Sequence, residues 1–315
     1  MSEFDWIARY LRPLAGDGSQ TLTDDAAYAF DCVLTKDLLV EGTHFLPTDP
    51  LDLTARKALR VNMSDLIAKG ARPDAYLLGL VWPKHLGEAS FETFCSGLAQ
   101  EQADHGLRLL GGDTTVGDTL TISVTMFGTL QSQAPILRAG GQPGDLLVVT
   151  GTIGDSLLGL EAARKTTPAD DLNALPYRLP QLPFAEAAFI AEHARAGLDV
   201  SDGLIADAQH LATASGVDIV IETHNVPLSD AGERASQRLP ELLTHGDDYQ
   251  TLFLIAPTTA EPLKNAQIQG LSLTTIGRAQ TASGDRPRVI AIGRNGQELN
   301  FSRPGWDPLR SDELS

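Results

Sequence analysis

Apolar residues in the N-terminal half follow two spacings, one typical of helices and one typical of buried strands. Helical spacing predicts helices over residues 4–14, 53–69 and 91–105. Short continuous apolar runs predict strands over 32–34 and 75–81. These elements alternate along the chain, which favours a sheet with helices packed against it.

Two further strands complete this half of the chain. Residues 107–110 form an apolar run that would place Gly112 and Asp113 at the carboxyl end of a strand, and residues 120–128 alternate as another strand. Backbone amides and a carboxylate at a strand end are a usual position for ligand contacts. The Gly- and Pro-containing turn cluster over 140–145 is the best candidate for a domain boundary.

The C-terminal half mixes strands and helices in the same way. The expected strands cover 146–150, 198–200, 217–221 and 288–292, and the expected helices cover 157–164, 184–195 and 204–215. A Pro-rich stretch over 168–183 predicts a long surface connection. Because neither half has the steady repeat of a barrel, we expect a two-domain α+β or α/β protein. It would have an N-terminal mixed sheet with helices over 1–140 and a C-terminal α/β sandwich over 141–315.

Composition narrows the class of protein further. The 315 residues suffice for two cores, and 42% hydrophobic with 21% charged residues is ordinary for a globular protein. A formal net charge of −17 argues against a nucleic-acid surface. Cys32 and Cys95 are too few for a disulfide framework. The first residues lack a basic region followed by an apolar core, and no apolar run approaches membrane-spanning length, so we expect a cytoplasmic protein.

Acidic residues recur in six short segments, nearly all beside Gly, Ser or Thr. These segments cover residues 23–27, 35–37, 62–65, 111–115, 199–203 and 246–249. Small residues let the backbone approach a ligand, and carboxylate and hydroxyl oxygens are the ligands that Mg²⁺ prefers. Crowded carboxylates repel one another unless cations lie between them. If four of the segments converge, the site therefore requires divalent metal.

Each segment taken alone has a plainer interpretation as a surface turn or a helix cap, and the two interpretations have about even odds. Ser201 or Asp202 would cap a helix beginning near Leu204. A lone His44 is more often structural than a ligand contact. Several segments adjoin apolar runs, however, where a purely solvated acid has little reason to lie. A metal-rich pocket with no nucleophile of its own points to a bound polyphosphate such as ATP with Mg²⁺.

The common nucleotide-binding loops are missing. Residues 159–166 resemble a P-loop only superficially, because Arg164 stands where the second glycine is needed. No Gly-x-Gly-x-x-Gly sequence opens a helix after a strand. An ATP site in this chain would therefore use other residues.

The motifs, in their order, resemble the thiamine-monophosphate kinase family of the aminoimidazole-ribonucleotide synthetase-like superfamily. The resemblance runs from about Phe4 to Trp306, and it is closest over 57–66, 111–115 and 199–204. It implies two α/β domains facing each other, with the N-terminal sheets of two subunits joined in a barrel across a homodimer. It also implies that ATP and several Mg²⁺ ions bind in the cleft. The γ-phosphate would pass directly to the dianionic phosphate of thiamine monophosphate, giving thiamine diphosphate without a covalent enzyme intermediate.

The resemblance also implies roles for individual residues. The Mg²⁺ ligands would be Asp25, Thr35, Asp37, Asp65, Asp113, Asp199 and Asp202. The ATP contacts would be Gly112, Asp113, Arg138 and Ser201, and the contacts to thiamine monophosphate would be His44, Asp247 and Trp306. Trp306 has an alternative interpretation as an anchor for the polar tail.

Two positions depart from the family pattern. Thr23 stands where the family often has Gly, and Lys36 stands where it often has Thr. An ammonium cannot ligate Mg²⁺, so Lys36 predicts either a differently bound metal or a lysine contact to phosphate.

Other functions stay open on the sequence. A ribonucleotide synthetase or a selenophosphate synthetase of the same superfamily would share the fold. The reactive Cys of the selenophosphate enzymes lies in a glycine-rich loop, whereas Cys32 lies in an apolar run. A non-catalytic acidic scaffold would bind Mg²⁺ without nucleotide, and thermal stabilisation by ATP distinguishes it from an enzyme.

Overall fold

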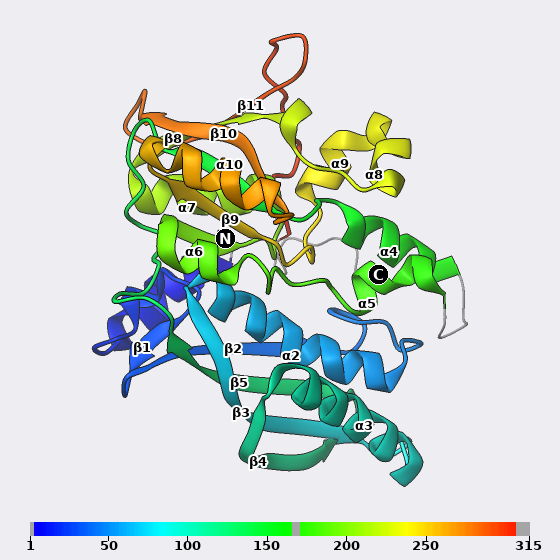
Figure 1. Ribbon diagram of the computed structural model, residues 1–315. Coiled ribbons are helices and arrows are strands. Elements are labelled where there is room, and N and C mark those ends of the chain that lie inside the picture. Colours follow the sequence, from blue (N-terminus) through cyan, green and yellow to red (C-terminus); the bar gives the residue numbers. More distant parts are fainter. Residues whose placement is uncertain (1–2, 166–170, 307–315) are drawn as a thin grey trace.

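The chain forms two mixed sheets stacked one above the other in Figure 1, each with helices packed on it. The computed structural model describes residues 3–165 and 171–306. The N-terminal sheet has the strand order β1-β2-β5-β3-β4. Its strands are β1 (Ala27–Ala29), β2 (Cys32–Val40), β3 (Ala71–Pro83), β4 (Arg108–Gly117) and β5 (Thr121–Leu130). All neighbours pair antiparallel except β3 and β4, which run parallel.

Two long helices, α2 (Leu51–Ala68) and α3 (Glu88–His105), cover one face of this sheet. Helix α2 is buried on nearly all sides, because it also packs against β7, β9 and α6 of the second sheet layer. Figure 1 shows it between the two layers. The polar residues that interrupt its apolar pattern, among them Lys57, Asn62 and Ser64, are consequently buried as well.

The other face of the N-terminal sheet has no helix on it among the described residues. Leu38 and Leu77 on this face are exposed by 52% and 39%, and the edge strand β4, including Leu110, is exposed along almost its whole length. Edge strands and apolar faces of this kind favour association with another chain.

The second sheet has the strand order β11-β8-β10-β6-β9-β7. Its strands are β6 (Leu146–Thr150), β7 (Ala194–Asp199), β8 (Val217–Glu222), β9 (Thr251–Ile255), β10 (Leu273–Thr281) and β11 (Val289–Ile292). Helix α7 (Leu204–Ser215) packs on the face that carries Leu147 and Val149. Helices α6 (Ala187–His193) and α10 (Ala260–Ile268) pack on the opposite face, which carries Val148. Both faces are thus covered.

Five further helices lie in the described part of the chain. They are α1 (Glu3–Trp6), α4 (Asp155–Lys165), α5 (Leu175–Arg178), α8 (Asp230–Arg234) and α9 (Leu239–Thr244). Single turns lie at Ile7–Leu11, Arg12–Leu14, Gln20–Leu22, Leu172–Ala174, Thr223–Asn225, Ser236–Arg238 and Pro257–Thr259.

The prediction of two α+β domains is confirmed, although several element bounds were wrong. Strand β4 continues to Gly117, so Gly112 and Asp113 lie inside a strand and not after its end. Pairing with β3 carries the strand on past a bulge between Leu109 and Gly111.

The Pro-rich stretch was wrongly predicted to be a surface connection over its described part, 171–183. Tyr177 and Arg178 there are almost fully buried, because they pack under α4 and pair with the loop before α2. Residues 168–170 lie outside the described part. The predicted helix over 4–14 is broken into a short α-helix and tighter or wider turns.

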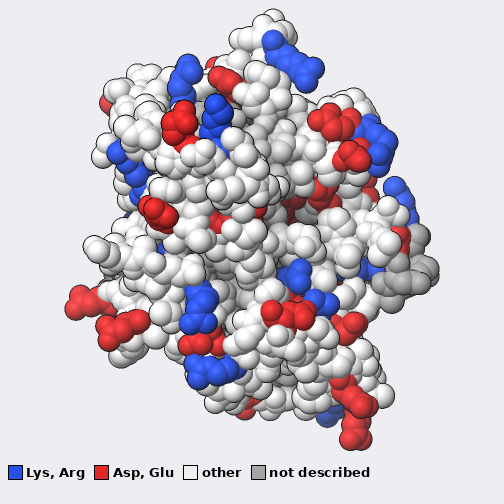
Figure 2. Space-filling model, in the orientation of Figure 1, with Lys and Arg blue, Asp and Glu red and all other residues white. Residues whose placement is uncertain are grey.

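Surface charge and the length and hydropathy of helices are the features that distinguish nucleic-acid-binding and membrane-spanning proteins. Figure 2 shows Lys and Arg side chains scattered singly among acidic ones, with no continuous basic stripe on this face. No helix in the described ranges is long and apolar enough to cross a membrane.

Candidate active site

Three of the predicted metal ligands converge where the two sheet layers meet. Asp25 precedes β1, Asp65 lies on α2, and Asp199 ends β7. One carboxylate oxygen from each of the three lies within 4.8 Å of the others. The residues come from points 40 and 134 positions apart in the sequence (65 − 25 and 199 − 65), so only the folded chain brings them together.

Asp37 and Thr35 extend this group from β2. Both face the helix-covered side of the sheet, because they alternate with exposed Lys36. The Thr35 hydroxyl donates a hydrogen bond to Asp65, and Ser64 donates one of 2.7 Å to Asp199. We call Asp25, Asp37, Asp65 and Asp199 the aspartate cluster.

Burial and mutual repulsion raise three of the four pKa values. Burial, then repulsion by Asp25, raises the pKa of Asp37 to about 6, and burial with the charge of Asp25 raises that of Asp199 to about 7. The pKa of Asp65 is well above its usual value, because it is buried and faces the other three. These carboxylates therefore bind protons more tightly than isolated aspartates do, as expected where negative charges are crowded without a cation.

Asp25 differs because two basic side chains lie against it. Lys69, fully buried at the end of α2, and Arg138 both pair with its carboxylate. Burial alone would raise the pKa of Asp25, but these positive charges outweigh it and lower the pKa to about 2. Asp24 supports the arrangement by accepting from the Arg138 backbone amide at 2.9 Å.

The donor set fits magnesium. It consists of carboxylate and hydroxyl oxygens only, which are the ligands of hard divalent cations. One oxygen of Asp37 is buried with no hydrogen-bond partner in the described structure, and buried polar atoms are seldom left so. A cation among these oxygens would satisfy that atom and relieve the repulsion.

A second carboxylate group lies at the N-terminus of α7. Asp202 lies within 4.8 Å of Asp207 and His210, counted between ligand atoms. Asp207 accepts from the backbone amides of Asp202 and Gly203 at 3.0 Å each. Asp207 therefore caps the turn that begins its own helix. Ser201 is adjacent, and its carbonyl accepts from the Asp247 amide at 2.9 Å.

The residues predicted to contact the substrate that accepts the phosphate are His44, Asp247 and Trp306. They lie along one continuous stretch beside these groups. Lys57 of α2 links two of them, donating to the His44 carbonyl at 3.0 Å and to Asp247 at 2.8 Å. The Trp306 amide donates to the Asp202 carbonyl at 2.9 Å, and the Trp306 side chain is 39% exposed. Trp306 is therefore anchored to the same turn that carries Ser201 and Asp202, yet its ring remains accessible.

One ring nitrogen of His44 is held by the backbone. Its Nδ1 accepts from the Val40 amide at 3.0 Å, and burial lowers the pKa of the ring. Because Nδ1 accepts, the ring hydrogen lies on Nε2, which can donate to a ligand oxygen.

Gly112 and Asp113 do not join the aspartate cluster within one chain. Asp113 pairs with Gly79 and so lies on the uncovered face of the sheet, opposite to Asp37. Two strands, β5 and β3, also separate β4 from β2, which corresponds to roughly 14 Å at the usual strand spacing.

Lys36 also points to the uncovered face. Its ammonium donates to the Ser123 hydroxyl at 2.5 Å and lies 3.5 Å from that of Thr125. It is directed away from its neighbour Asp37, so it does not take a metal's place in the cluster of its own chain.

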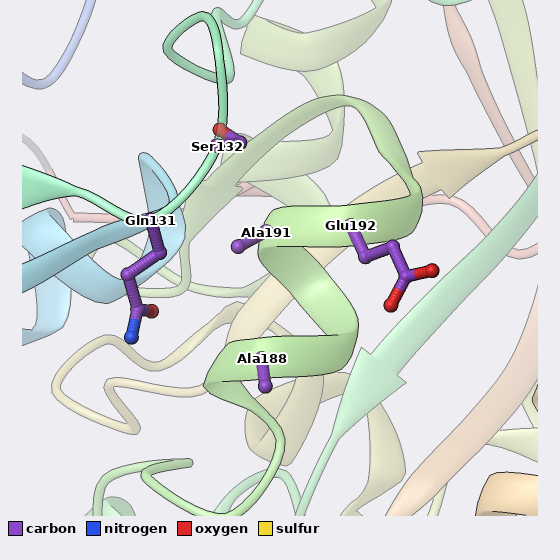
Figure 3. Close-up of a pocket in the computed structure, with 5 residues that line it drawn as sticks. All are labelled: Gln131, Ser132, Ala188, Ala191 and Glu192. Carbon is purple, nitrogen blue, oxygen red and sulfur yellow. The ribbon is translucent and has the colours of Figure 1, made fainter.

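One recess of the surface lies away from all of these residues. It is an open recess of about 560 Å³ between the end of β5 and α6, lined by Gln131, Ser132, Ala188, Ala191 and Glu192 (Figure 3). None of the predicted site residues lines it, and its lining offers few polar groups that converge.

Sequence reasoning missed two basic residues of the site, Lys57 and Lys69, and it missed the pairing of Arg138 with Asp25. Lys57, Lys69 and Arg138 each pair with an acidic segment, and only the ATP contact of Arg138 was expected. No local signal identified Lys57 and Lys69, because α2 also carries other charged residues and its burial depends on strands far along the chain.

Comparisons with known proteins agree with this geometry. Residues 23–130 match the model for the AIR synthase related protein N-terminal domain, and residues 142–290 match that for the C-terminal domain. The chain is 39% identical to a thiamine-monophosphate kinase of Caulobacter vibrioides, covering 97% of this chain and 90% of that protein. It is 33% identical to one of Haemophilus influenzae, covering 99% of each.

Solved structures of similar proteins share the fold of this chain. A structure described as AaThiL complexed with AMPPCP and TMP has a TM-score of 0.83 at 29% identity, covering 98% of this chain and 97% of that one. A thiamine-monophosphate kinase of Stenotrophomonas maltophilia has a TM-score of 0.76 at 31% identity, covering 95% and 98%.

Proposed function

The chain belongs to the thiamine-monophosphate kinase family, and from this premise we propose that it phosphorylates thiamine monophosphate with ATP to give thiamine diphosphate. The observation that carries the proposal is the aspartate cluster. Its residues come from both sheet layers, and it lies beside His44, Asp247 and Trp306, the proposed contacts to thiamine monophosphate. The relative solved with AMPPCP and TMP supports the same pairing of ligands.

We assign the aspartate cluster to Mg²⁺, together with the Thr35 hydroxyl and Asp202. Bound there, Mg²⁺ would neutralise the phosphate oxygens that must approach each other. Arg138, held against Asp25, and the Ser201 turn at the start of α7 are the proposed ATP contacts. A guanidinium and a helix N-terminus both favour phosphate oxygens.

The reaction needs no nucleophile from the chain. An oxygen of the acceptor's phosphate attacks the γ-phosphorus of ATP, the bond from that phosphorus to the β–γ bridging oxygen breaks, and ADP leaves with the electron pair. The acceptor's second pKa is about 6, so it is largely dianionic at neutral pH and no strong general base is required. His44, Asp247 and Trp306 orient the acceptor, and positioning with charge stabilisation supplies the rate enhancement.

We further propose that the protein is a homodimer joined through the uncovered face of the N-terminal sheet. Leu38 and Leu77 on that face, with the exposed edge strand β4, form the apolar surface that a second copy would cover. Pairing would also place Gly112 and Asp113 against a second chain, which is the arrangement in which they can serve an active site.

A coupled assay of ADP release with and without thiamine monophosphate tests the function, with chromatography identifying the product. We expect thiamine diphosphate and ADP in equal amounts and no product when EDTA removes the metal. AMP, free phosphate or absence of thiamine diphosphate would contradict the proposal. Thermal stabilisation by Mg²⁺ but not by ATP would favour an acidic scaffold instead.

A further inference from the structure

A buried ion pair joins the two sheet layers at the acceptor end of the site. Lys57 lies on α2 of the first layer and is 2% exposed, and Asp247 lies in the loop before β9 of the second. Their charged atoms are 2.8 Å apart. A cation buried this deeply requires partners on every side, and Lys57 has three: Asp247, the His44 carbonyl and the Tyr177 ring at 4.0 Å from its ammonium.

The carboxylate of Asp247 is held at both oxygens. Lys57 donates to one, and the Tyr249 hydroxyl donates to the other at 3.0 Å. The backbone of Asp247 has φ of 70°, a conformation that costs energy in a residue with a side chain. The loop therefore keeps the carboxylate in a fixed position at some cost.

The pair is open to solvent on the side of Asp247 only. The Lys57 side chain is 2% exposed and that of Asp247 is 28% exposed, so the ammonium forms the back of the site and the carboxylate forms its accessible edge. An arriving ligand meets the carboxylate first. Because the pair is neutral as a whole, its open edge favours a neutral N–H donor, such as a ring amino group, over a full positive charge.

We propose that Lys57 is a positioning residue for the acceptor, fixing the Asp247 carboxylate and the His44 backbone in one geometry across the junction of the two layers. The proposal rests on the proposed function, since the acceptor's amino-substituted ring is the group that Asp247 would receive. Lys57 acts through its neighbours and does not touch the reacting phosphates.

The test compares Lys57→Met, Lys57→Arg and Tyr249→Phe with the unchanged protein. Lys57→Met removes the charge but keeps the buried stem, so we expect the KM for thiamine monophosphate to rise about tenfold or more while the KM for ATP stays within about twofold. Lys57→Arg keeps the positive charge, so its KM for thiamine monophosphate should stay close to that of the unchanged protein. Tyr249→Phe removes one hydrogen bond and should raise the acceptor KM by a smaller factor.

A matched control comes from a second buried ion pair close to the first, since Tyr177, which contacts Lys57, precedes Arg178. Arg178 of α5 donates to Asp49 at 2.7 Å, and Asp49 lies in the loop that follows His44. Arg178→Met should lower the melting temperature, as Lys57→Met does, but leave both KM values unchanged. This separates loss of a buried cation from loss of acceptor positioning.

Calorimetric binding of thiamine monophosphate accompanies the kinetics and needs no turnover. An unchanged protein without kinase activity would contradict the proposed function. An active protein whose acceptor KM and binding are unaffected by Lys57→Met would overturn only the present inference. If Lys57→Met does not fold, an unaffected acceptor KM and binding in Tyr249→Phe overturn it in the same way.

Discussion

Asp65 is the carboxylate that the three other carboxylates of the aspartate cluster repel. It is buried on α2 and faces Asp199, Asp37 and Asp25, whose charges add to burial in raising its pKa. Such a residue destabilises the metal-free fold in order to bind cations, so its loss should affect stability and activity in opposite directions.

We therefore expect Asp65→Asn to lower kcat by at least about tenfold, and by up to roughly 3–4 kcal/mol of transition-state stabilisation, while raising the melting temperature of the metal-free protein. Steady-state kinetics at saturating Mg²⁺ and a thermal melt in EDTA measure the two effects. Asp104→Asn, at an exposed ion pair with Arg56, is the control and should change neither. Near-normal turnover in Asp65→Asn would make Asp65 a structural residue.

The raised pKa values of Asp37 and Asp199 also predict a pH dependence. Values of about 6 and about 7 in the folded chain exceed the usual 3.8, so the folded state binds these protons more tightly than the unfolded state does. Their stabilising contribution is complete below about pH 3.8 and is lost as pH rises through 7. Asp25 has the opposite sign, but its contribution is lost only as pH falls from 3.8 toward about 2.

Between about pH 5 and pH 8 we expect these two residues to reduce the stability of the metal-free protein as pH rises, and Mg²⁺ to restore it. The gain in melting temperature on adding Mg²⁺ should grow over the same range, because the metal competes with protons for the same oxygens. Melts across this range in EDTA and in excess Mg²⁺ test the prediction. A gain independent of pH would mean that the metal binds elsewhere.

Among the elements, helix α2 best illustrates how far the sequence could be interpreted. Its position was predicted within two residues, because apolar spacing and length are local properties. Its burial on nearly all sides was not predictable, since that depends on β7 and β9, which lie more than a hundred residues later. The same limit explains why the acidic motifs were recognised while their partners Lys57 and Lys69 were not.

Strand β4 shows a second limit. The pair Gly111-Gly112 was interpreted as the end of a strand, because glycine commonly interrupts strands. In the fold it accommodates a bulge and a close approach, since a side chain at Gly112 would collide with the Leu78 carbonyl of β3. Pairing with a neighbouring strand is non-local, so sequence alone could not distinguish the two outcomes.

The loop before β9 yields a prediction at the same scale. Gly246 lies against the Ser201 carbonyl so closely that a Cβ atom would overlap it. Gly246→Ala should therefore displace the loop from the Ser201 turn, raise the KM for thiamine monophosphate and lower the melting temperature. Gly284→Ala is the control, because nothing lies within 4 Å of the Cβ position there. Equal behaviour of the two variants would show that the loop tolerates the shift.

For the whole molecule, the uncovered sheet face predicts a shared active site. Asp113 lies on that face and away from the aspartate cluster of its own chain, so it can complete a site only in a partner. Asp113→Asn and Asp199→Asn should each be inactive as pure dimers. Mixing the two after mild dissociation should restore up to about a quarter of the unchanged activity, because half of the dimers are mixed and each has one intact site.

Sedimentation accompanies this experiment and should give a dimer at micromolar concentration. An active Asp113→Asn protein would remove Asp113 from the site, and a monomer would contradict the interface. Failure of the mixture to recover activity, although mixed dimers form, would mean that the two residues do not act in the same site across the interface.

The position of α2 between the layers has a consequence for synthesis on the ribosome. The helix and its own sheet are complete once β5 has emerged, but the strands that cover its other side include β9, which ends at Ile255. For the intervening 125 residues (255 − 130) the nascent chain carries an exposed, partly charged helix face. At about 5–20 residues per second this interval lasts roughly 6–25 seconds, long enough for chaperones to engage the unfinished chain.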